Sequence, residues 1–327
     1  MSESGQPSSS DPAAVLNQPA AAGRLREWLH DDVGRTFTRF HKLLLLLGIA
    51  TAWAVSLLLQ RALGVPEIRG FSASLLQNTS PLLGAIAGVL AILLGAGACA
   101  AFAARIRPEA PIFCAAVALL GLRMHGGSAR VALMTGGGRS ALLVMALELA
   151  VYFLAMLVVL VAVRRLVSTG TLPSDDDRDG ASLPVESLDQ RLLCTGTVSA
   201  VMAVILTLLC QSDRPGQTVC AVFIAAWVAS WCAFRFISVA PGVWYWGAPF
   251  FVGMAGYLYT WMYGSAAVAI GQPGGLLAAL ARPMPLDYAS LGVAGALVAY
   301  WNSRRHHRDR AATEEAPPAA DETYSRG

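Results

Sequence analysis

The chain has 327 residues, of which 55% are hydrophobic and 14% charged, and its formal net charge is +3. Soluble domains carry about 25% charged residues, and here the charges gather between long apolar stretches. This composition excludes an ordinary soluble domain and predicts an all-α, polytopic transmembrane helix bundle. The basic residues are spread among the connecting segments, so nothing indicates a nucleic-acid-binding surface.

The segment before the first apolar run divides into two parts. Residues 1–23 are rich in Ser, Pro and Ala and are predicted to form a disordered tail. In residues 24–42 apolar side chains recur at helical spacing between charged ones. This pattern predicts an amphipathic helix that lies either in the membrane interface or against the protein's own loops. No cleavable signal peptide is visible, so the first apolar run is expected to act as a signal anchor.

Eight apolar runs follow, at residues 43–60, 81–104, 110–122, 141–163, 194–210, 218–234, 243–264 and 286–301. A helix needs about 20 apolar residues to cross the hydrocarbon core of a membrane. The third run is therefore short, and Asp287 shortens the eighth. Residues 265–285 are apolar but are interrupted by GQPGG and RPMP, so they are predicted to form a loop or a re-entrant piece rather than a span.

The distribution of basic residues predicts how the runs are threaded, because cytoplasmic loops carry an excess of Lys and Arg. If all eight runs cross and the N-terminus is cytoplasmic, 17 of the 24 basic residues lie in the cytoplasm. If run 110–122 does not cross, the basic residues divide evenly between the two sides. The rule thus favours eight spans in a cell membrane, the bacterial plasma (inner) membrane in particular, with both termini in the cytoplasm.

A flexible, acidic cytoplasmic linker divides the spans into two groups of four, and a charged tail follows them. The predicted segments are a first half at 43–165, the linker at 166–192, a second half at 193–303 and a disordered tail at 304–327.

The two groups of spans resemble each other. APIFCAAVALLGLRMHG at 110–126 aligns without a gap with APFFVGMAGYLYTWMYG at 248–264. Further on, LELA with Glu148 corresponds to LDYA with Asp287, and each group ends at an Arg pair. We therefore predict an internal duplication into two parallel four-helix repeats related by an axis along the membrane normal. The alternative is a chance match between segments rich in Ala, Gly and Leu.

Glu148 and Asp287 are the candidate ion- or proton-binding residues. Each lies near the start of the last span of its half, roughly 25 Å from the cytoplasmic edge of that span. An acid inside a span is costly and marks a functional site by default. Two acids near a pseudo-twofold axis could bind a cation or share a proton. The structural alternative is that each carboxylate caps a helix start or reaches the interface.

The predicted outer loop RMHGGSARVALMTGGGRS combines basic side chains with two glycine clusters. Guanidinium groups and exposed backbone N–H groups suit an anion such as a phosphate or a lipid headgroup. A flexible turn with arginines that extend toward the interface is the alternative. The candidate residues are Arg123, His125, Arg130 and Arg139.

The six cysteines lie in or at the ends of apolar runs, and their spacing fits neither a zinc site nor a secreted disulfide framework. They are interpreted as small apolar fillers. Cys210 and Cys220 bracket a short loop and could form a disulfide if that loop is extracytoplasmic.

No catalytic residue, metal site or cofactor is predicted, and the protein is not expected to be an enzyme. No histidine lies deep in an apolar run, which argues against a haem held by two histidines in the membrane. The chain also contains no Walker, nucleophile-elbow or metalloprotease motif.

Three functions stay open. A non-catalytic membrane subunit or scaffold, which associates with the lipid bilayer and with other membrane subunits or further copies of itself, requires the fewest assumptions. The paired acids suggest instead a transporter or channel-like protein for a cation or a small solute. A lipid- or polyprenol-modifying enzyme could use the Arg-rich loop, but it would lack an evident nucleophile.

Overall fold

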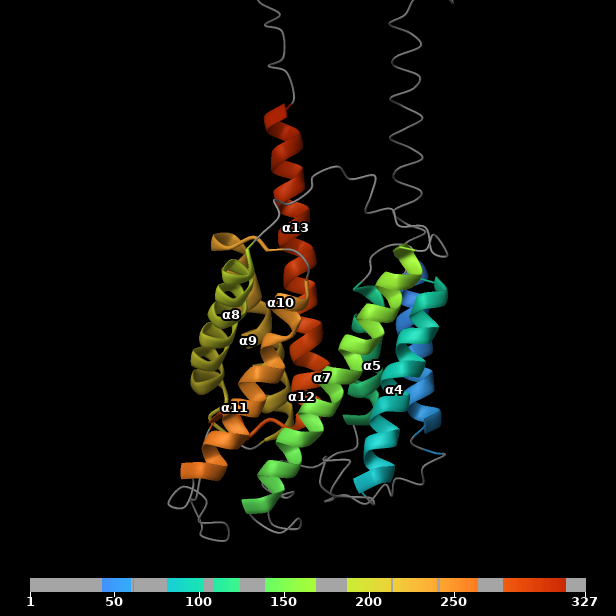
Figure 1. Ribbon diagram of the computed structural model, residues 1–327, viewed down its shortest axis with the longest axis vertical. Coiled ribbons are helices and arrows are strands. Elements are labelled where there is room, and N and C mark those ends of the chain that lie inside the picture. The colour runs from blue at the N-terminus through green and yellow to red at the C-terminus, as the bar shows by residue number, and fades with distance from the viewer. Residues whose placement is uncertain are drawn as a thin grey trace, which may run out of the picture. The chain divides into compact units, whose positions relative to one another are not determined.

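Helices form all the regular secondary structure of the described residues. The computed structural model describes residues 43–59, 61, 81–102, 109–123, 139–168, 187–212, 214–239, 242–263 and 279–315. Within these ranges there is no strand (Figure 1). The predicted tail and amphipathic helix of residues 1–42 lie outside the described residues. The all-α prediction is confirmed for the part of the chain that is described.

Among the described residues, three helices are long and apolar enough to cross a membrane: Ser140–Leu166 within α7 (Arg139–Ser168), α8 (Leu188–Leu209) and α9 (Pro215–Phe236). Shorter apolar helices are Leu43–Leu59, Ile86–Gly97 within α4 (Pro81–Phe102), and α5 (Ala110–Arg123). Large apolar side chains face outward on the long helices, with Val158 65% and Leu208 68% exposed. Such an apolar exterior suggests association with a membrane.

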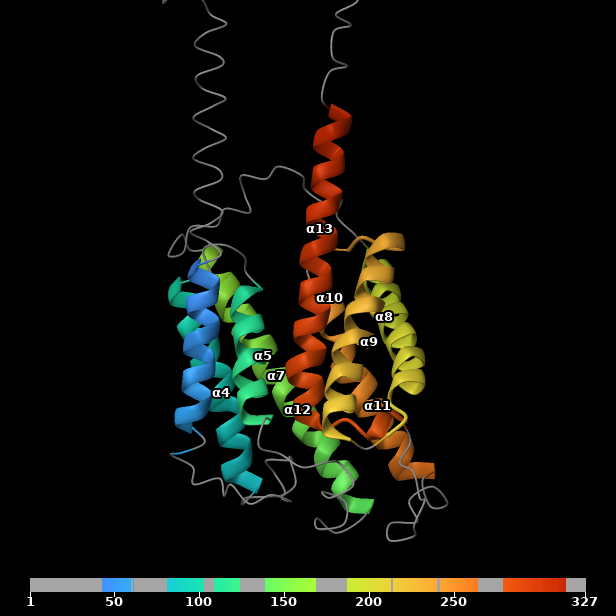
Figure 2. The same ribbon diagram turned by 180° about the vertical axis from the view of Figure 1, so that it is seen from behind.

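The chain after α9 is less regular than the chain before it (Figure 2). A four-residue helix, α10 (Val243–Trp246), precedes α11 (Ala248–Tyr263). The last helical stretch consists of η2 (Ala279–Ala281), α12 (Pro285–Asp287), the π-helix η3 (Tyr288–Gly292) and α13 (Val293–Glu315). The predicted run 286–301 is thus part of a longer helix whose beginning is broken.

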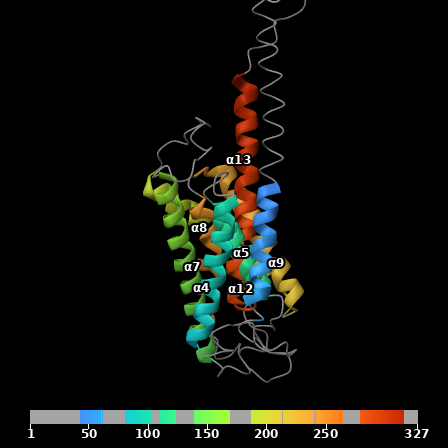
Figure 3. The ribbon, with the colours of Figure 1, turned by 90° about the vertical axis from the view of Figure 1, so that its right-hand side faces the viewer.

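Small residues allow the helices of the first half to approach one another closely. α4 packs against both α5 and α7 (Figure 3). A Cβ atom on Gly95 of α4 would lie 2.8 Å from the Cβ of Ala118 and 3.0 Å from the carbonyl oxygen of Cys114, both on α5. Because the backbone of α5 cannot give way cheaply, this helix spacing requires glycine at position 95.

Both α5 and α7 join the helices before the linker to those after it. α7 packs against α11, α12 and η3, and α5 packs against α12, η3 and α13. Within the second half, α9 packs against both α8 and α13. The described helices after Leu46 belong to one compact unit.

Helix ends extend into segments that the sequence assigned to the linker and the tail. α13 continues to Glu315, whereas a disordered tail is predicted from residue 304. Its extension is rich in Arg, Ala and Glu, which favour helix and prolong a helix that the apolar span has already begun. α7 likewise runs into the predicted linker, and α8 begins inside it, where the Ser187 hydroxyl accepts a hydrogen bond from the backbone of Gln190 at 3.3 Å. That side-chain cap fixes the start of α8.

Candidate functional site

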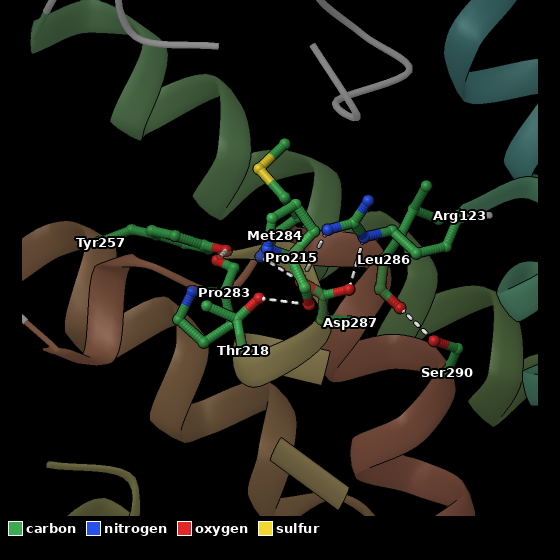
Figure 4. A network of polar contacts seen from close by, with 9 residues as sticks. All are labelled: Arg123, Pro215, Thr218, Tyr257, Pro283, Met284, Leu286, Asp287 and Ser290. Carbon is green, nitrogen blue, oxygen red and sulfur yellow. Dashed lines mark hydrogen bonds and ion pairs between the residues drawn. The ribbon is translucent and has the colours of Figure 1, made fainter. Parts of the chain in front are cut away.

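The centre of the candidate site is a buried ion pair between Arg123 and Asp287 (Figure 4). Arg123 is the last residue of α5 and Asp287 is the last residue of α12. Nε of Arg123 lies 2.5 Å from Oδ1 of Asp287, and Nη2 lies 3.5 Å from Oδ2. The side chains are only 4% and 0% exposed. The ion pair therefore connects the first predicted half to the second, deep inside the protein.

Asp287 also caps the beginning of its own helix. The backbone N–H of Met284 donates to Oδ2 of Asp287 at 2.8 Å (Figure 4). Asp287 thus accepts a hydrogen bond from a backbone N–H group at a helix start, as the structural alternative for this residue predicts. Asp287 combines that local role with the distant contact to Arg123.

The chain just before Asp287 is buried although it is not a regular helix. The hydroxyl of Tyr257 donates to the carbonyl oxygen of Pro283 at 2.5 Å, and the hydroxyl of Tyr288 donates to that of Leu280 at 2.7 Å. Irregular backbone inside a membrane protein needs partners of this kind, because lipid offers none. Residues 281–290 are all buried, so the described part of the predicted loop or re-entrant piece lies within the protein.

Arg282 fixes the same segment from another side. Its Nη1 donates to the carbonyl oxygen of Cys210 at the end of α8, and the residue is 7% exposed. The broken segment is therefore held by α5, α8 and α11 together. A π-helix follows it at Tyr288–Gly292, and π-helical turns inside longer helices occur frequently at functional sites.

Glu148 belongs to the same cluster of polar side chains. It lies in α7 and is 1% exposed. The hydroxyl of Tyr152, one helical turn further along, donates to Oε1 of Glu148 at 2.7 Å. The hydroxyl of Tyr257 lies close enough to Glu148, Asp287 and Arg123 to interact electrostatically with each of them. The structure thus gathers both candidate acids and one candidate arginine around Tyr257.

The candidate anion-binding residues are not all gathered in this way. Arg123 lies in a helix and bonds Asp287, whereas the sequence analysis placed it in an outer loop. Its guanidinium points into the protein because α5 continues one residue beyond the predicted run. Arg139 is the first residue of α7. His125 and Arg130 lie outside the described residues, so the headgroup site stays a prediction.

Cys210 and Cys220 are not joined by a disulfide. Cys210 is buried at the C-cap of α8, whereas Cys220 is exposed on α9. The neighbours of Cys220 that face the protein interior are Thr218 and Ala221. Cys220 therefore lies on the outer face of α9, whereas Cys210 is buried.

Several members of the cluster were not among the candidates from sequence. Tyr152 is one of them. It stands four residues after the candidate acid Glu148, on the same helix face, and this spacing could have identified it. Tyr257 is one of several aromatic residues in run 243–264, and nothing in that run distinguishes it from its neighbours. Arg282 stands in a segment that is otherwise apolar, and a lone charge there is the signal that could have identified it.

The fold and the polar cluster are compatible with a membrane protein. A scan against protein-family models and searches of curated proteins and of solved structures found no match.

Proposed function

We propose that the chain is an integral membrane protein of eight spans in two parallel halves, with both termini in the cytoplasm of a bacterial cell. Hydrogen bonds at one end of the bundle support this threading. There the end of α5 (Arg123), the end of α8 (Cys210) and the start of α12 (Asp287) share one cluster. At the other end, Thr195 near the start of α8 donates to the carbonyl oxygen of Trp244 in α10 at 3.0 Å.

The short helix α5 can serve as a span under this proposal. Its 14 residues reach about 21 Å, less than the roughly 30 Å thickness of the hydrocarbon core. Nearly all of its residues are buried, so other helices rather than lipid surround it. A helix enclosed by protein does not have to match the membrane thickness.

The contacts between the halves support the duplication. The repeat pairs α5 with α11, and α7 with the stretch from α12 to α13. If the halves are exchanged, α7 takes the place of the stretch from α12 to α13, and α11 takes the place of α5. The contact of α7 with α11 then corresponds to the contact of α5 with α12, η3 and α13, and both contacts are present. An axis that relates the halves would pass between these contacts, close to the polar cluster.

The function that this arrangement supports best is proton-linked transport along the interface between the halves. The observation that carries it is the group of buried acids, Glu148 and Asp287, at an interface with a broken helix. Intramembrane acids and discontinuous helices between repeats mark the transport sites of many carriers. A carboxyl group with a neighbouring hydroxyl suffices to bind a proton, whereas hard cations such as Ca²⁺ and Mg²⁺ take about six or more oxygen ligands.

A non-catalytic subunit or scaffold that binds other membrane proteins or further copies of itself is the competing proposal. The apolar runs are rich in small residues, which favour association between helices. In the structure, small residues serve contacts within the chain: Cβ atoms on Gly88 and Gly121 would lie within 3 Å of Tyr152 and Ser56, respectively. The small residues therefore favour the scaffold less than the sequence alone indicated.

Proton flux into liposomes tests the transport proposal. The full chain is reconstituted with a pH-sensitive dye inside, and a pH gradient is imposed. We expect Glu148→Gln and Asp287→Asn to slow the flux, while Asp189→Asn, at an exposed acid of α8, leaves it unchanged. Flux that equals that of empty liposomes in every sample overturns the proposal. A stoichiometric partner recovered in mild detergent, together with absent flux, would favour the scaffold.

A further inference from the structure

A third buried acid, Glu109, lies at the opposite end of α5 from Arg123. Glu109 immediately precedes α5, and its carbonyl oxygen accepts hydrogen bonds from the backbone of Ile112 and Phe113 at 3.1 Å each. The residue is 3% exposed. Along α5 it is about 21 Å from Arg123. Glu109 is not among the candidate residues of the sequence analysis.

Glu109 faces the second half of the chain. A Cβ atom on Gly242, just before α10, would lie 3.5 Å from Cγ of Glu109 and 3.1 Å from Cε1 of Tyr300. Both side chains therefore converge on Gly242, and glycine leaves the space in which they meet. α5 contacts η3, which directly follows Asp287 in the chain, and it also contacts α13, the helix that carries Tyr300.

The surroundings of Glu109 are mainly aromatic. The ring of Tyr300 lies 5.2 Å from that of Tyr245 and 5.9 Å from that of Phe234, measured between centroids. One helical turn beyond Glu109, the ring of Phe113 lies 5.4 Å from that of Trp301. Titratable groups on the facing elements include the hydroxyls of Tyr300 and Tyr245 and the thiol of Cys194, which interacts with Tyr245.

Arg304 is a basic residue of the facing helix. It follows Tyr300 by one turn on α13 and is partly exposed. By the threading proposed above, this end of the bundle is the cytoplasmic one. α13 thus carries an aromatic side chain beside Glu109 and a basic side chain one helical turn further on.

We propose that Glu109 is the proton-binding group at the cytoplasmic end of the interface between the halves, matching Glu148 and Asp287 at the outer end. This inference rests on the proposed proton-linked function and extends it to the other side of the membrane. The carboxylate takes one proton from cytoplasmic water, becomes a neutral carboxylic acid, and returns the proton by the reverse step. A buried carboxyl at each end gives the interface a proton acceptor toward each side.

The competing role for Glu109 is purely structural. An acid at a helix N-terminus interacts favourably with the helix dipole, whether or not it exchanges protons during function. Glu109→Gln keeps the size and the backbone hydrogen bonds of the residue but removes its titration. A structural carboxyl also takes up protons, so the two roles separate when protonation of this one side chain is measured together with the flux of Glu109→Gln.

Labelling with a hydrophobic carbodiimide provides that measurement. A protonated carboxyl adds across one C=N bond of dicyclohexylcarbodiimide, and the acyl group then migrates to nitrogen, so the whole reagent stays on the residue. The full chain in liposomes is labelled over a series of pH values, and peptides are read by mass spectrometry. We expect labelling of Glu109 that declines as the pH rises, no label at this position in Glu109→Gln, and little at exposed Asp189.

Flux completes the experiment. Glu109→Gln should slow proton flux by about a hundredfold or more, the typical loss when a proton-transferring side chain is removed, and Glu109→Asp should restore part of it. Labelling of Glu109 that is absent or independent of pH overturns the inference, as does wild-type flux in Glu109→Gln. Wild-type protein without flux but with pH-dependent label at Glu109 would instead refute the transport function alone. If Glu109→Gln fails to fold, the flux of Glu109→Asp and the pH dependence of labelling in the wild-type protein still test the inference.

Discussion

The helix α7 and the stretch from α12 to α13 occupy matching places in the two halves, yet they hold their acids differently. α7 is an uninterrupted helix of 30 residues, and Glu148 lies inside it. In the second half the chain is broken before α12, Asp287 stands at the helix start, and a π-helix follows. A hydroxyl one turn away in the same helix bonds Glu148, whereas an arginine from the other half bonds Asp287.

This difference suggests that the acids at the two related positions have different roles. The hydrogen bond from Tyr152 to Glu148 lies within α7, and the contact of Glu148 with the second half is an electrostatic one with the hydroxyl of Tyr257. The bond of Asp287 to Arg123 is itself a contact between the halves. Protonation of Asp287 would weaken it, so we expect Asp287 to govern how the halves meet.

The largest expected effect comes from removing one partner of that contact. Arg123→Ala leaves the Asp287 carboxylate buried without its guanidinium, and breaking a buried pair in this way costs about 3–5 kcal/mol. The free energy of unfolding in mixed detergent micelles should fall accordingly. Arg164→Ala, at an exposed arginine of α7, is the control and should change it little.

A double variant sharpens the comparison. Arg123→Met with Asp287→Leu replaces both charges by apolar groups and should be more stable than Arg123→Ala, because no buried charge is left alone. Equal losses in Arg123→Ala and Arg164→Ala would mean that the ion pair does not link the halves energetically. Asp287 would then be no different from Glu148 in this respect.

Sequence patterns located the helices better than they located the site. Run 110–122 agrees with α5 to within one residue, and run 218–234 lies within α9, because hydrophobic length is a local property. The ion pair joins residues 164 positions apart, and no local pattern records such a contact. The break before Asp287 was predicted from GQPGG and RPMP, but its burial depends on Tyr257 and on other helices.

Gly256 offers an intermediate test of how the broken segment is seated. A Cβ atom there would lie 2.6 Å from the carbonyl oxygen of Leu280, which is backbone and cannot swing aside. Gly256→Ala should therefore lower the free energy of unfolding by about 1–3 kcal/mol. Gly196→Ala is a matched control, because nothing lies within 4 Å of that position. Alanine at position 196 should stabilise α8 slightly, since glycine is a poor helix former.

The repeat makes the Gly256 experiment informative about both halves. Its counterpart in the first half is Ala118, which packs against Gly95 of α4 rather than against a broken segment. Ala118→Gly should cost no more than about 1 kcal/mol, the penalty of glycine within a helix. If Gly256→Ala were as harmless as Gly196→Ala, the segment around Leu280 would not be packed against α11 as described, and the contrast between the halves would lose its basis.

The smallest effect is expected from the hydroxyl groups that hold the broken segment. Tyr288→Phe removes the hydrogen bond to the carbonyl oxygen of Leu280 and should lower the free energy of unfolding by about 1 kcal/mol. Tyr152→Phe removes the bond to Glu148 instead, so we expect it to leave the segment intact. Hydrogen exchange at the backbone of residues 279–287 separates the two, because opening of the segment should accelerate in Tyr288→Phe alone. Faster exchange in both variants would show that α7 and the broken segment open together, and that Glu148 is coupled to the contact between the halves after all.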